Sequence, residues 1–400
     1  MTITVDELLN KLIELKGSDL HIIVGLHPAV RKDGELYQIP GYDRLDAQTV
    51  KEMTYNILTP EQINNFENDK DSRHELDFAY SISGVGRFRC NIHKQRGTIG
   101  VTVRALSSNI PKIQSLGLPE SVMEFTKAKK GLILVTGPTG SGKSTTLASI
   151  IDCINETRKD HIITIEDPIE YLHNSKQSYV TQREVGFAAD TLSFKNALKY
   201  ALRQDPDVIL IGEMRDYETM GIAITSAETG HLVFGTLHTS SAAQTVGRII
   251  DVFPTDQQPQ VRAQLSANLV GVVSQLLLPK ADQSGRCIAC EVMKINPAIK
   301  NNIRTNNVDS VYQTIQTSTG DGMQTMDQAL IKLVKDGMIS YETAYPYIRD
   351  ENTHRTLAPF AKAPVEPSMM KSQEIQQETQ PAPAKTIDKT SSFVKPPWEQ

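Results

Sequence analysis

GPTGSGKS, residues 137–144, decides the fold of this chain, because it fits the phosphate-binding pattern G-x-x-x-x-G-K-[ST]. The apolar run Leu132–Val135 precedes it, and the helix-like run Thr145–Asn155 follows it. In this strand–loop–helix setting the glycines let several backbone N–H groups point at one phosphate, and the helix N-terminus adds partial positive charge. The stretch therefore predicts a nucleoside-triphosphate site rather than a chance turn rich in glycine and serine.

The same loop indicates which residues contact the triphosphate. Lys143 can reach the β- and γ-phosphates, and the Ser144 hydroxyl is placed to ligate Mg²⁺. We therefore expect ATP and Mg²⁺ as cofactors. The predicted nucleotide-binding residues are Gly137, Pro138, Thr139, Gly140, Ser141, Gly142, Lys143, Ser144 and Thr145.

Composition is typical of a soluble globular protein. The 400 residues are enough for two or three domains, and 39% hydrophobic with 22% charged residues is ordinary for such chains. A net charge of −5 argues against a protein built to bind nucleic acid non-specifically, so no nucleic-acid partner is expected. The chain shows no apolar run of bilayer length and no signal-peptide pattern, which together predict a cytoplasmic location.

Changes in sequence pattern divide the chain into four parts. Residues 1–107 are predicted to form a small α+β domain, 108–118 a linker, and 119–357 an α/β domain with a largely parallel sheet. Within that α/β domain, the pattern after about residue 265 predicts helices. Residues 358–400, rich in proline and glutamine, are expected to be a disordered tail.

Four strands of the predicted parallel sheet are near-continuous apolar runs, as expected of strands covered on both faces. Each run is followed by polar residues, and ligands bind at the carboxyl ends of strands in such sheets. We therefore expect the four strand ends to converge on the triphosphate. The runs are Leu132–Thr136, Ile162–Ile165, Val208–Ile211 and Leu232–Gly235.

Three residues that follow these strands are the predicted catalytic residues. Glu213 stands at the Walker B position, with Gly212 in place of the usual aspartate, and is predicted to orient the attacking water. Glu166, followed by Asp167, is a second acidic position that could hold a metal-bound water or polarise the attacking one. His238 is predicted to sense the γ-phosphate. The competing interpretations are a surface glutamate and a structural histidine.

The small domain carries a cluster of arginines that could complete such a site. P-loop sites often use an arginine finger to stabilise transition-state charge. Charged residues on strands often only face solvent, but the set suggests that the small domain presents cations to a nucleotide, including one on a neighbouring subunit. The candidate fingers are Arg87, Arg89, Arg96 and Arg104.

Two further features allow two interpretations each. Cys287 and Cys290 form a C-x-x-C pair that is half of a zinc site, but no second pair exists, and the surrounding run 286–293 favours buried strand thiols. Phe393 and Trp398, near the chain end, are either a short docking motif or incidental members of a solvated tail.

A set of motifs beyond the P-loop makes the chain similar to a known family. It resembles the retraction ATPases of type IV pili, within the secretion and pilus superfamily of hexameric ATPases. The P-loop alone is shared by many unrelated proteins, whereas the combination with an acidic box, a Gly-Glu Walker B and a histidine box is specific. The motifs are GSDLHI (17–22), GRFRCN (86–91), ITIEDPIEYLH (163–173), QREVG (182–186), DPDVILIGEMRD (205–216), TGHLVFGTLHTSSA (229–242) and GMQTMDQAL (322–330).

The resemblance implies a PAS-like N-terminal domain joined to a RecA-like core. It implies a homohexameric ring with ATP between the two domains, completed by arginines of the small domain. It also implies that turnover moves a platform protein in the inner membrane, so that the pilus retracts and drives twitching motility, with the ATPase at the cytoplasmic face. Glu166, Glu213 and His238 fall in the family's acidic box, catalytic position and histidine box.

The chain departs from the family pattern at a few positions. The motif A-I-R-N-L-I-R, linked to retraction, has Lys300 and Asn302 in place of arginine and leucine. Lysine keeps the charge but lacks the planar guanidinium fork. Gly247 stands where the family usually has aspartate. The changes at Lys300 and Asn302 bear on coupling to retraction and not on hydrolysis.

Other functions remain open at this point. Within the same class, the chain could be an accessory retraction ATPase that works with a second such ATPase; an assembly or secretion ATPase would carry an extra domain and a four-cysteine module. From other classes, it could be a regulatory module that binds ATP with little turnover, or a nucleic-acid translocase, which the acidic charge opposes. The direction of mechanical work does not follow from the phosphate chemistry.

Overall fold

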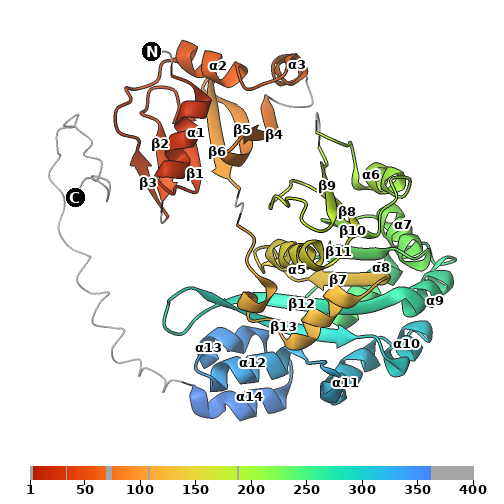
Figure 1. The fold of residues 1–400 in the computed structure, drawn as a ribbon. Coiled ribbons are helices and arrows are strands. Elements are labelled where there is room, and N and C mark those ends of the chain that lie inside the picture. The colour runs from red at the N-terminus through yellow and green to blue at the C-terminus, as the bar shows by residue number, and fades with distance from the viewer. Residues whose placement is uncertain (1–2, 33, 69–73, 107–108, 187–188, 362–400) are drawn as a thin grey trace.

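The structure is a computed structural model that describes residues 3–32, 34–68, 74–106, 109–186 and 189–361. A small N-terminal domain lies at one end, and a larger domain follows it (Figure 1). The mixed α/β architecture predicted from the sequence is confirmed. Within the described ranges no helix is both long and apolar enough to cross a membrane.

The small domain is an antiparallel sheet with helices packed on it. The strand order is β3-β2-β1-β6-β5-β4, and every neighbouring pair is antiparallel. Its core includes apolar residues from α1, α2 and the inward face of the sheet, together with Phe66 of α3. The elements are α1 (Val5–Glu14), β1 (Asp19–Ile23), β2 (Ala29–Lys32), β3 (Glu35–Gln38), α2 (Ala47–Tyr55), α3 (Pro60–Asn68), β4 (Glu75–Ile82), β5 (Gly86–Gln95) and β6 (Thr98–Ala105).

The large domain is built on a seven-stranded sheet in the order β13-β12-β7-β11-β10-β8-β9. Only β13 is antiparallel to its neighbour. The strands are β7 (Gly131–Thr136), β8 (His161–Glu166), β9 (Tyr179–Glu184), β10 (Val208–Ile211), β11 (Leu232–Leu237), β12 (Leu269–Pro279) and β13 (Arg286–Lys294). The four predicted apolar strands are all present, and they are neighbours in the middle of this sheet.

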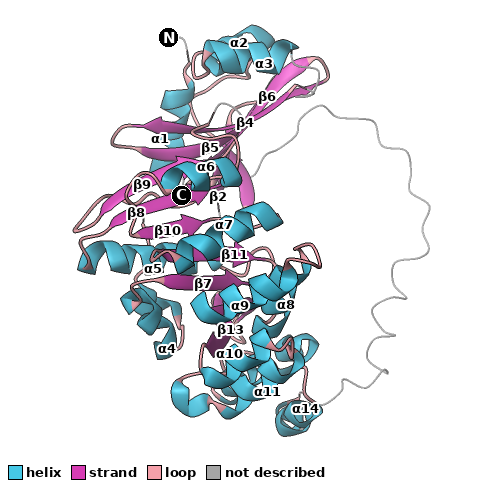
Figure 2. Ribbon diagram, turned by 90° about the vertical axis from the view of Figure 1, so that its right-hand side faces the viewer, coloured by secondary structure: helices cyan, strands magenta, loops and turns pink. Residues whose placement is uncertain are grey.

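Helices cover both faces of this sheet, and Figure 2 shows them in side view. On β7, Ile133 and Val135 pack on the face covered by α5, whereas Leu132 and Leu134 pack on the face covered by α6, α7 and α8. The helices are α4 (Glu120–Met123), α5 (Lys143–Thr157), α6 (Phe194–Ala201), α7 (Tyr217–Glu228), α8 (Ala242–Asp251), α9 (Gln258–Asn268), α10 (Pro297–Arg304), α11 (Asp309–Thr317), α12 (Met326–Lys335), α13 (Tyr341–Ala344) and α14 (Glu351–Leu357).

The expectation of helices after about residue 265 is wrong for β12, whereas the strand-like run 286–293 expected around the two cysteines is present as β13. The chain forms β12 and β13 before the helices α10–α14 begin. β12 lies between β7 and β13, so apolar residues occupy both of its faces and no alternation shows in the sequence. An apolar run without alternation does not distinguish a covered strand from a buried helix.

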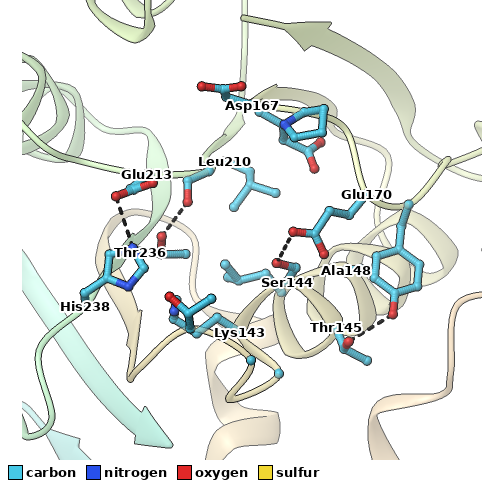
Figure 3. A pocket seen from close by; sticks show the side chains of 18 of the residues that line it. Lys143, Ser144, Thr145, Ala148, Asp167, Glu170, Leu210, Glu213, Thr236 and His238 are labelled. Carbon is cyan, nitrogen blue, oxygen red and sulfur yellow. Dashed lines mark hydrogen bonds and ion pairs between the residues drawn. The ribbon is translucent and has the colours of Figure 1, made fainter. Parts of the chain in front are cut away.

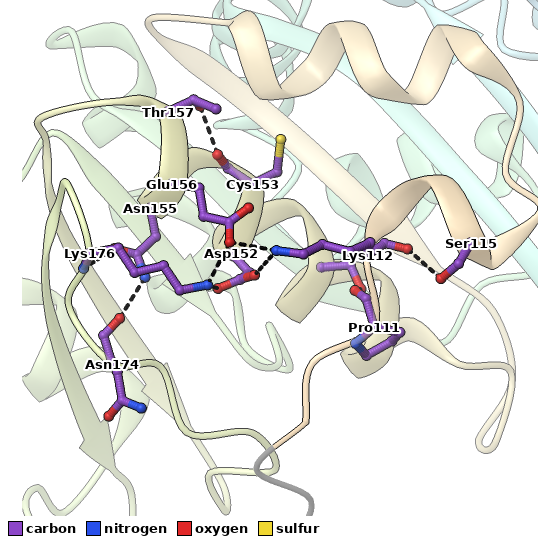
Figure 4. Close-up of polar contacts among 11 residues, drawn as sticks. Pro111, Lys112, Ser115, Asp152, Cys153, Asn155, Glu156, Thr157, Asn174 and Lys176 are labelled. Atoms are coloured by element: carbon purple, nitrogen blue, oxygen red, sulfur yellow. Dashed lines mark hydrogen bonds and ion pairs between the residues drawn. The ribbon is translucent and has the colours of Figure 1, made fainter.

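The second half of the predicted linker is fastened to α5. The Ser149 hydroxyl donates to the Pro111 carbonyl at 2.7 Å, and Lys112 forms ion pairs with Asp152 and Glu156. Lys176 binds the same two carboxylates from the opposite side (Figure 4). The linker from Pro111 onward is therefore attached to the helix that begins at the P-loop.

Two remaining expectations concern the cysteines and the tail. In β13, Cys290 is buried and Cys287 partly exposed; burial raises the pKa of the Cys290 thiol to about 12. Among the described residues, no group of three or more His, Cys, Asp and Glu side chains could hold a metal. Of the predicted tail, Ala358–Phe360 form a 3₁₀ turn, and the part with Phe393 and Trp398 lies outside the described residues.

Candidate functional site

The ends of β7, β8, β10 and β11 converge on one cavity, as the four apolar strands predicted. The cavity has a volume of about 460 Å³ and is lined at these strand ends by the P-loop, Glu166, Glu213 and His238. Figure 3 shows Lys143 of the P-loop together with Glu213 and His238. Of the predicted nucleotide-binding residues, Thr139, Gly140, Gly142, Lys143, Ser144 and Thr145 line it. Gly137, Pro138 and Ser141 belong to the same loop but are not part of the lining.

Two glycines allow the P-loop to adopt its shape. Gly142 has a left-handed φ of 88° and immediately precedes α5. Gly137 has φ 142°, and a Cβ there would lie 2.3 Å from the Gln275 carbonyl oxygen on β12. Side chains at either position are therefore strained, and at Gly137 also blocked by backbone. The loop is packed tightly against the neighbouring strand.

β12 also holds the P-loop through a side chain. The Gln275 side-chain amide donates to the Ser141 carbonyl at 2.8 Å, and Gln275 is 1% exposed. The Thr136 and Ser274 hydroxyls bond at 2.8 Å across the same pair of strands. A buried side-chain bond of this kind fixes the loop backbone, because breaking it leaves polar groups without partners.

Lys143, the P-loop lysine, points back across the loop. Its ammonium donates to the carbonyls of Gly137 at 2.8 Å and Pro138 at 3.1 Å. Burial lowers the pKa of Lys143, and the carboxylates of Glu213 and Glu170 partly offset this shift. An ammonium has three protons, so it can serve the loop and a phosphate oxygen together.

Ser144 and Thr145 meet two residues that were not singled out from the sequence. The Ser144 hydroxyl donates to the Glu170 carboxylate at 2.9 Å, and the Thr145 and Tyr171 hydroxyls bond at 2.9 Å. A hydroxyl beside a carboxylate is an oxygen donor set of the kind Mg²⁺ prefers. Ser144 and Glu170 therefore fit the predicted ion.

Glu213 lies just beyond the end of β10 and is held on two sides. Arg215 donates to one carboxylate oxygen at 2.6 Å, and the His238 Nε2 atom lies 3.1 Å from the other. The hydrogen bond from Arg215 is the main reason that the pKa of Glu213 is lowered. A carboxylate with a lowered pKa is a weak base that stays ionised, which suits orienting a water molecule more than removing its proton.

Glu166 lines the cavity but is engaged within its own part of the sheet. Its carboxylate accepts from the Thr164 hydroxyl at 2.6 Å and from the Gln182 amide of β9 at 3.2 Å. Burial raises the pKa of Glu166, and these two hydrogen bonds oppose that shift. The carboxylate therefore joins β8 to β9 at the cavity wall.

None of the four candidate arginine fingers is among the described residues that line the cavity. Arg87 forms an ion pair with Glu184 of β9 at 2.9 Å, which joins the two domains. Arg104 pairs with Asp19 at 2.7 Å inside the small domain, and Arg96 has φ 49° in the turn between β5 and β6. Arg89 lines a second cavity between the domains.

Three of the site residues that the sequence analysis did not single out lie in or next to motifs that it recognised. Glu170 and Tyr171 lie within the motif 163–173, and Arg215 is two residues from Glu213. Their partners depend on loop paths that no periodic pattern encodes. Gln275 had no signal, because its segment was expected to be helical.

A parallel sheet with a P-loop after β7, and with acidic and histidine side chains at the neighbouring strand ends, defines a P-loop ATPase. Comparison with known proteins narrows this class. Residues 2–345 match the family described as Type II/IV secretion system protein, and the chain belongs to that family.

Individual relatives cover most of the chain. It is 47% identical over 328 residues to the type IV pilus retraction ATPase PilT of Pseudomonas aeruginosa, spanning 82% of this chain and 93% of that protein. It is 45% identical over 317 residues to a twitching motility protein of Neisseria gonorrhoeae, spanning 79% of this chain and 83% of that protein.

Two solved structures of ATPases have a fold similar to that of this chain. A crystal structure of the pilus retraction motor PilT with bound ADP is 47% identical, with a TM-score of 0.80 over 88% of this chain and 98% of that one. The DotB ATPase of Legionella pneumophila is 26% identical, with a TM-score of 0.75 over 87% of this chain and 96% of that one.

Proposed function

We propose that this chain is a motor ATPase that powers type IV pilus retraction and thereby twitching motility. The observation that carries the proposal is the placement of Glu213, which reaches the cavity of the P-loop while Arg215 and His238 hold its carboxylate. Support for the pilus as the object of the work comes from relatives named as a retraction ATPase and a twitching motility protein.

ATP binds on the P-loop in this proposal. Backbone N–H groups of residues 139–144, which include the N-terminus of α5, receive the phosphates, and Lys143 neutralises their charge. Mg²⁺, when bound, supplies positive charge that stabilises the transferring phosphoryl group. Ser144 and Glu170 are the side chains that hold it, because they bring a hydroxyl and a carboxylate together.

Glu213 orients the attacking water, and His238 orients Glu213. The imidazole shares a hydrogen bond with the carboxylate, so its position sets the direction in which the carboxylate accepts from water. Phosphoryl transfer needs positioning and charge stabilisation more than a strong base. Glu166 acts in this scheme by holding the acidic box at the cavity wall.

The ring is the second part of the proposal. A homohexamer at the cytoplasmic face of the inner membrane would let the small domain of one copy bring Arg87, Arg89, Arg96 or Arg104 to the site of another. It would act on the platform protein of the pilus machine, alone or with a second retraction ATPase.

Asn302 is one departure from the family motif. Its side-chain amide donates to the Thr314 hydroxyl of α11 at 3.2 Å, so the changed residue is accommodated between α10 and α11.

Pilus length and twitching in a deletion strain test the function. Complementation with the wild-type gene should restore short, dynamic pili, whereas Lys143→Ala should leave long, static pili and no twitching. Lys195→Ala, a surface lysine paired with Glu218 away from the site, is the matched control and should complement. Absent pili in the deletion strain would show an assembly motor, and full complementation by Lys143→Ala would show that turnover is not required.

A further inference from the structure

The motif GMQTMDQAL, residues 322–330, is not among the described residues that line the cavity and has no role in the site described so far. It begins α12, which packs on β13 near the bottom of Figure 1. Thr325 and Gln328 form a capping box at the start of the helix. Asp327 in the first turn is 3% exposed, so its carboxylate needs partners.

Asp327 uses its carboxylate to fix the segment that follows α13. It accepts from the backbone amides of Arg349 at 3.0 Å and Asp350 at 3.1 Å, and from the Tyr312 hydroxyl at 2.9 Å. Three donors satisfy a buried carboxylate, and two of them are main-chain groups. Asp327 therefore determines where Arg349 lies.

From this position Arg349 reaches the catalytic half of the molecule. Its guanidinium donates to the Ser240 carbonyl at 3.1 Å. Ser240 belongs to the loop 239–242, which leads from His238, just after β11, to Ala242, the first residue of α8. A residue of the segment between α13 and α14 thus holds the loop two positions beyond the imidazole.

Glu291 of β13 holds the other end of the same loop. It is 1% exposed, and one carboxylate oxygen accepts from the Ala242 amide at 2.7 Å. The other oxygen is buried without a hydrogen-bond partner among the described residues. Burial raises the pKa of Glu291, and the charge of Asp327 adds to that shift, while the Ala242 amide, the charge of Arg349 and the Met326 amide oppose it. The loop 239–242 is therefore held at Ser240 and at Ala242, each time by the C-terminal part of the chain.

We propose that Asp327, Arg349 and Glu291 are positioning residues that set His238 against Glu213, so that the C-terminal helices control the rate of ATP hydrolysis. The inference rests on the role proposed above for His238. The motif at 322–330 acts at a distance in this scheme, because it holds Arg349, Arg349 holds the loop, and the loop holds the imidazole. A force on the C-terminal helices would thereby reach the water-orienting carboxylate through this loop.

Steady-state ATPase kinetics of the full-length protein test the network. Arg349→Ala should lower kcat about 3- to 10-fold, as expected for a residue that acts through another, and leave the KM for ATP within about 2-fold. Arg349→Lys, which keeps one donor, should recover at least half of the lost kcat. Arg355→Ala is the matched control, since Arg355 pairs with Glu351 of α14 on the exposed surface and should leave kcat unchanged.

A merely structural role predicts a different result. It would lower the melting temperature and the number of ADP sites per chain, but not the kcat per site. Measuring kcat per ADP-binding site therefore separates the two roles. Unchanged kcat per site in Arg349→Ala would overturn the inference, as would a loss in Arg349→Ala that Arg349→Lys does not recover at all.

A double-mutant cycle identifies the route. In a His238→Ala background, Arg349→Ala should cause no further loss, because the residue through which it acts is gone. Additive losses would overturn the inference while leaving the role of His238 intact. If His238→Ala alone left kcat unchanged, the proposed role of His238 would fail first, and the positioning network would fail with it.

Discussion

The carboxyl ends of the central strands in the large sheet and the arginine-bearing strands of the small domain differ in where their polar side chains lie. In the large sheet, the carboxyl ends of four neighbouring strands bring Lys143, Glu213 and His238 to one cavity. In the small domain, Arg87 and Arg104 are engaged in ion pairs within the chain, away from that cavity. Because the carboxyl ends of parallel strands lie on the same side of the sheet, the residues that follow them are brought close together. A charged residue on an exposed strand instead takes whichever partner the packing brings near.

Glu213→Gln should have the largest effect and tests the cavity side of the comparison. Replacing the carboxylate with an amide should lower kcat by about 10²- to 10³-fold, because the attacking water loses its acceptor. ATP affinity, measured by equilibrium binding, should stay within about 3-fold. Glu218→Gln on α7, paired with Lys195 outside the cavity, is the control and should keep full activity. Equal loss of binding and turnover would make Glu213 a ligand-binding residue.

Arg215→Ala tests the cavity further, through the pH dependence of kcat. The pKa of Glu213 is lowered chiefly by Arg215, so in the wild type the carboxylate stays ionised well into the acid range and activity falls only once it is protonated. Removing Arg215 should raise that pKa and move the acid limb of the kcat profile to higher pH, with at most about a 3-fold loss of kcat at neutral pH, where the carboxylate stays ionised without Arg215. An unmoved acid limb would contradict the assignment.

Arg87→Ala tests the small-domain side and should act on stability. The Arg87–Glu184 pair is largely shielded from water, with 21% and 8% of the two side chains exposed, so losing it should cost about 2 kcal/mol. Arg104→Ala is the comparison: Arg104 is 65% exposed, and about 1 kcal/mol or less is expected. Denaturant unfolding measures both. A large loss of kcat per subunit in Arg87→Ala, without loss of stability, would instead place Arg87 at a neighbouring site.

Deletion of residues 362–400 should have the smallest effect. The described residues up to 361 already form the two domain cores and line the cavity with the P-loop, Glu213 and His238. ATPase activity and melting temperature should therefore match those of the full chain. A drop of more than about 2-fold in kcat would show that the tail contributes to ATPase activity. The tail would then be a third functional region, in addition to the two compared above.

The sequence predicted the parts of the site that topology alone places. A P-loop between an apolar run and a helix, and polar residues after three further apolar runs, sufficed for Lys143, Glu213 and His238. It did not predict Gln275 or the order of the strands, because β12 has no alternation and pairs with a strand far away in the chain. Nor did it predict Glu170 or the partner of Arg87, since these contacts depend on the paths of loops and on the docking of two domains.

The position of β12 has a consequence for how the protein is made. Ser274 bonds to Thr136 across 138 residues of chain, and β7 lies between β11 and β12. Contacts so distant in sequence form late and slow folding. A nascent chain that has emerged only as far as α9 therefore exposes the edge of β7, the strand that leads into the P-loop, to pairing with other chains. Fragments meant to express the ATPase core should accordingly extend through Lys294, so that β12 covers the edge of β7 and β13 in turn pairs with β12.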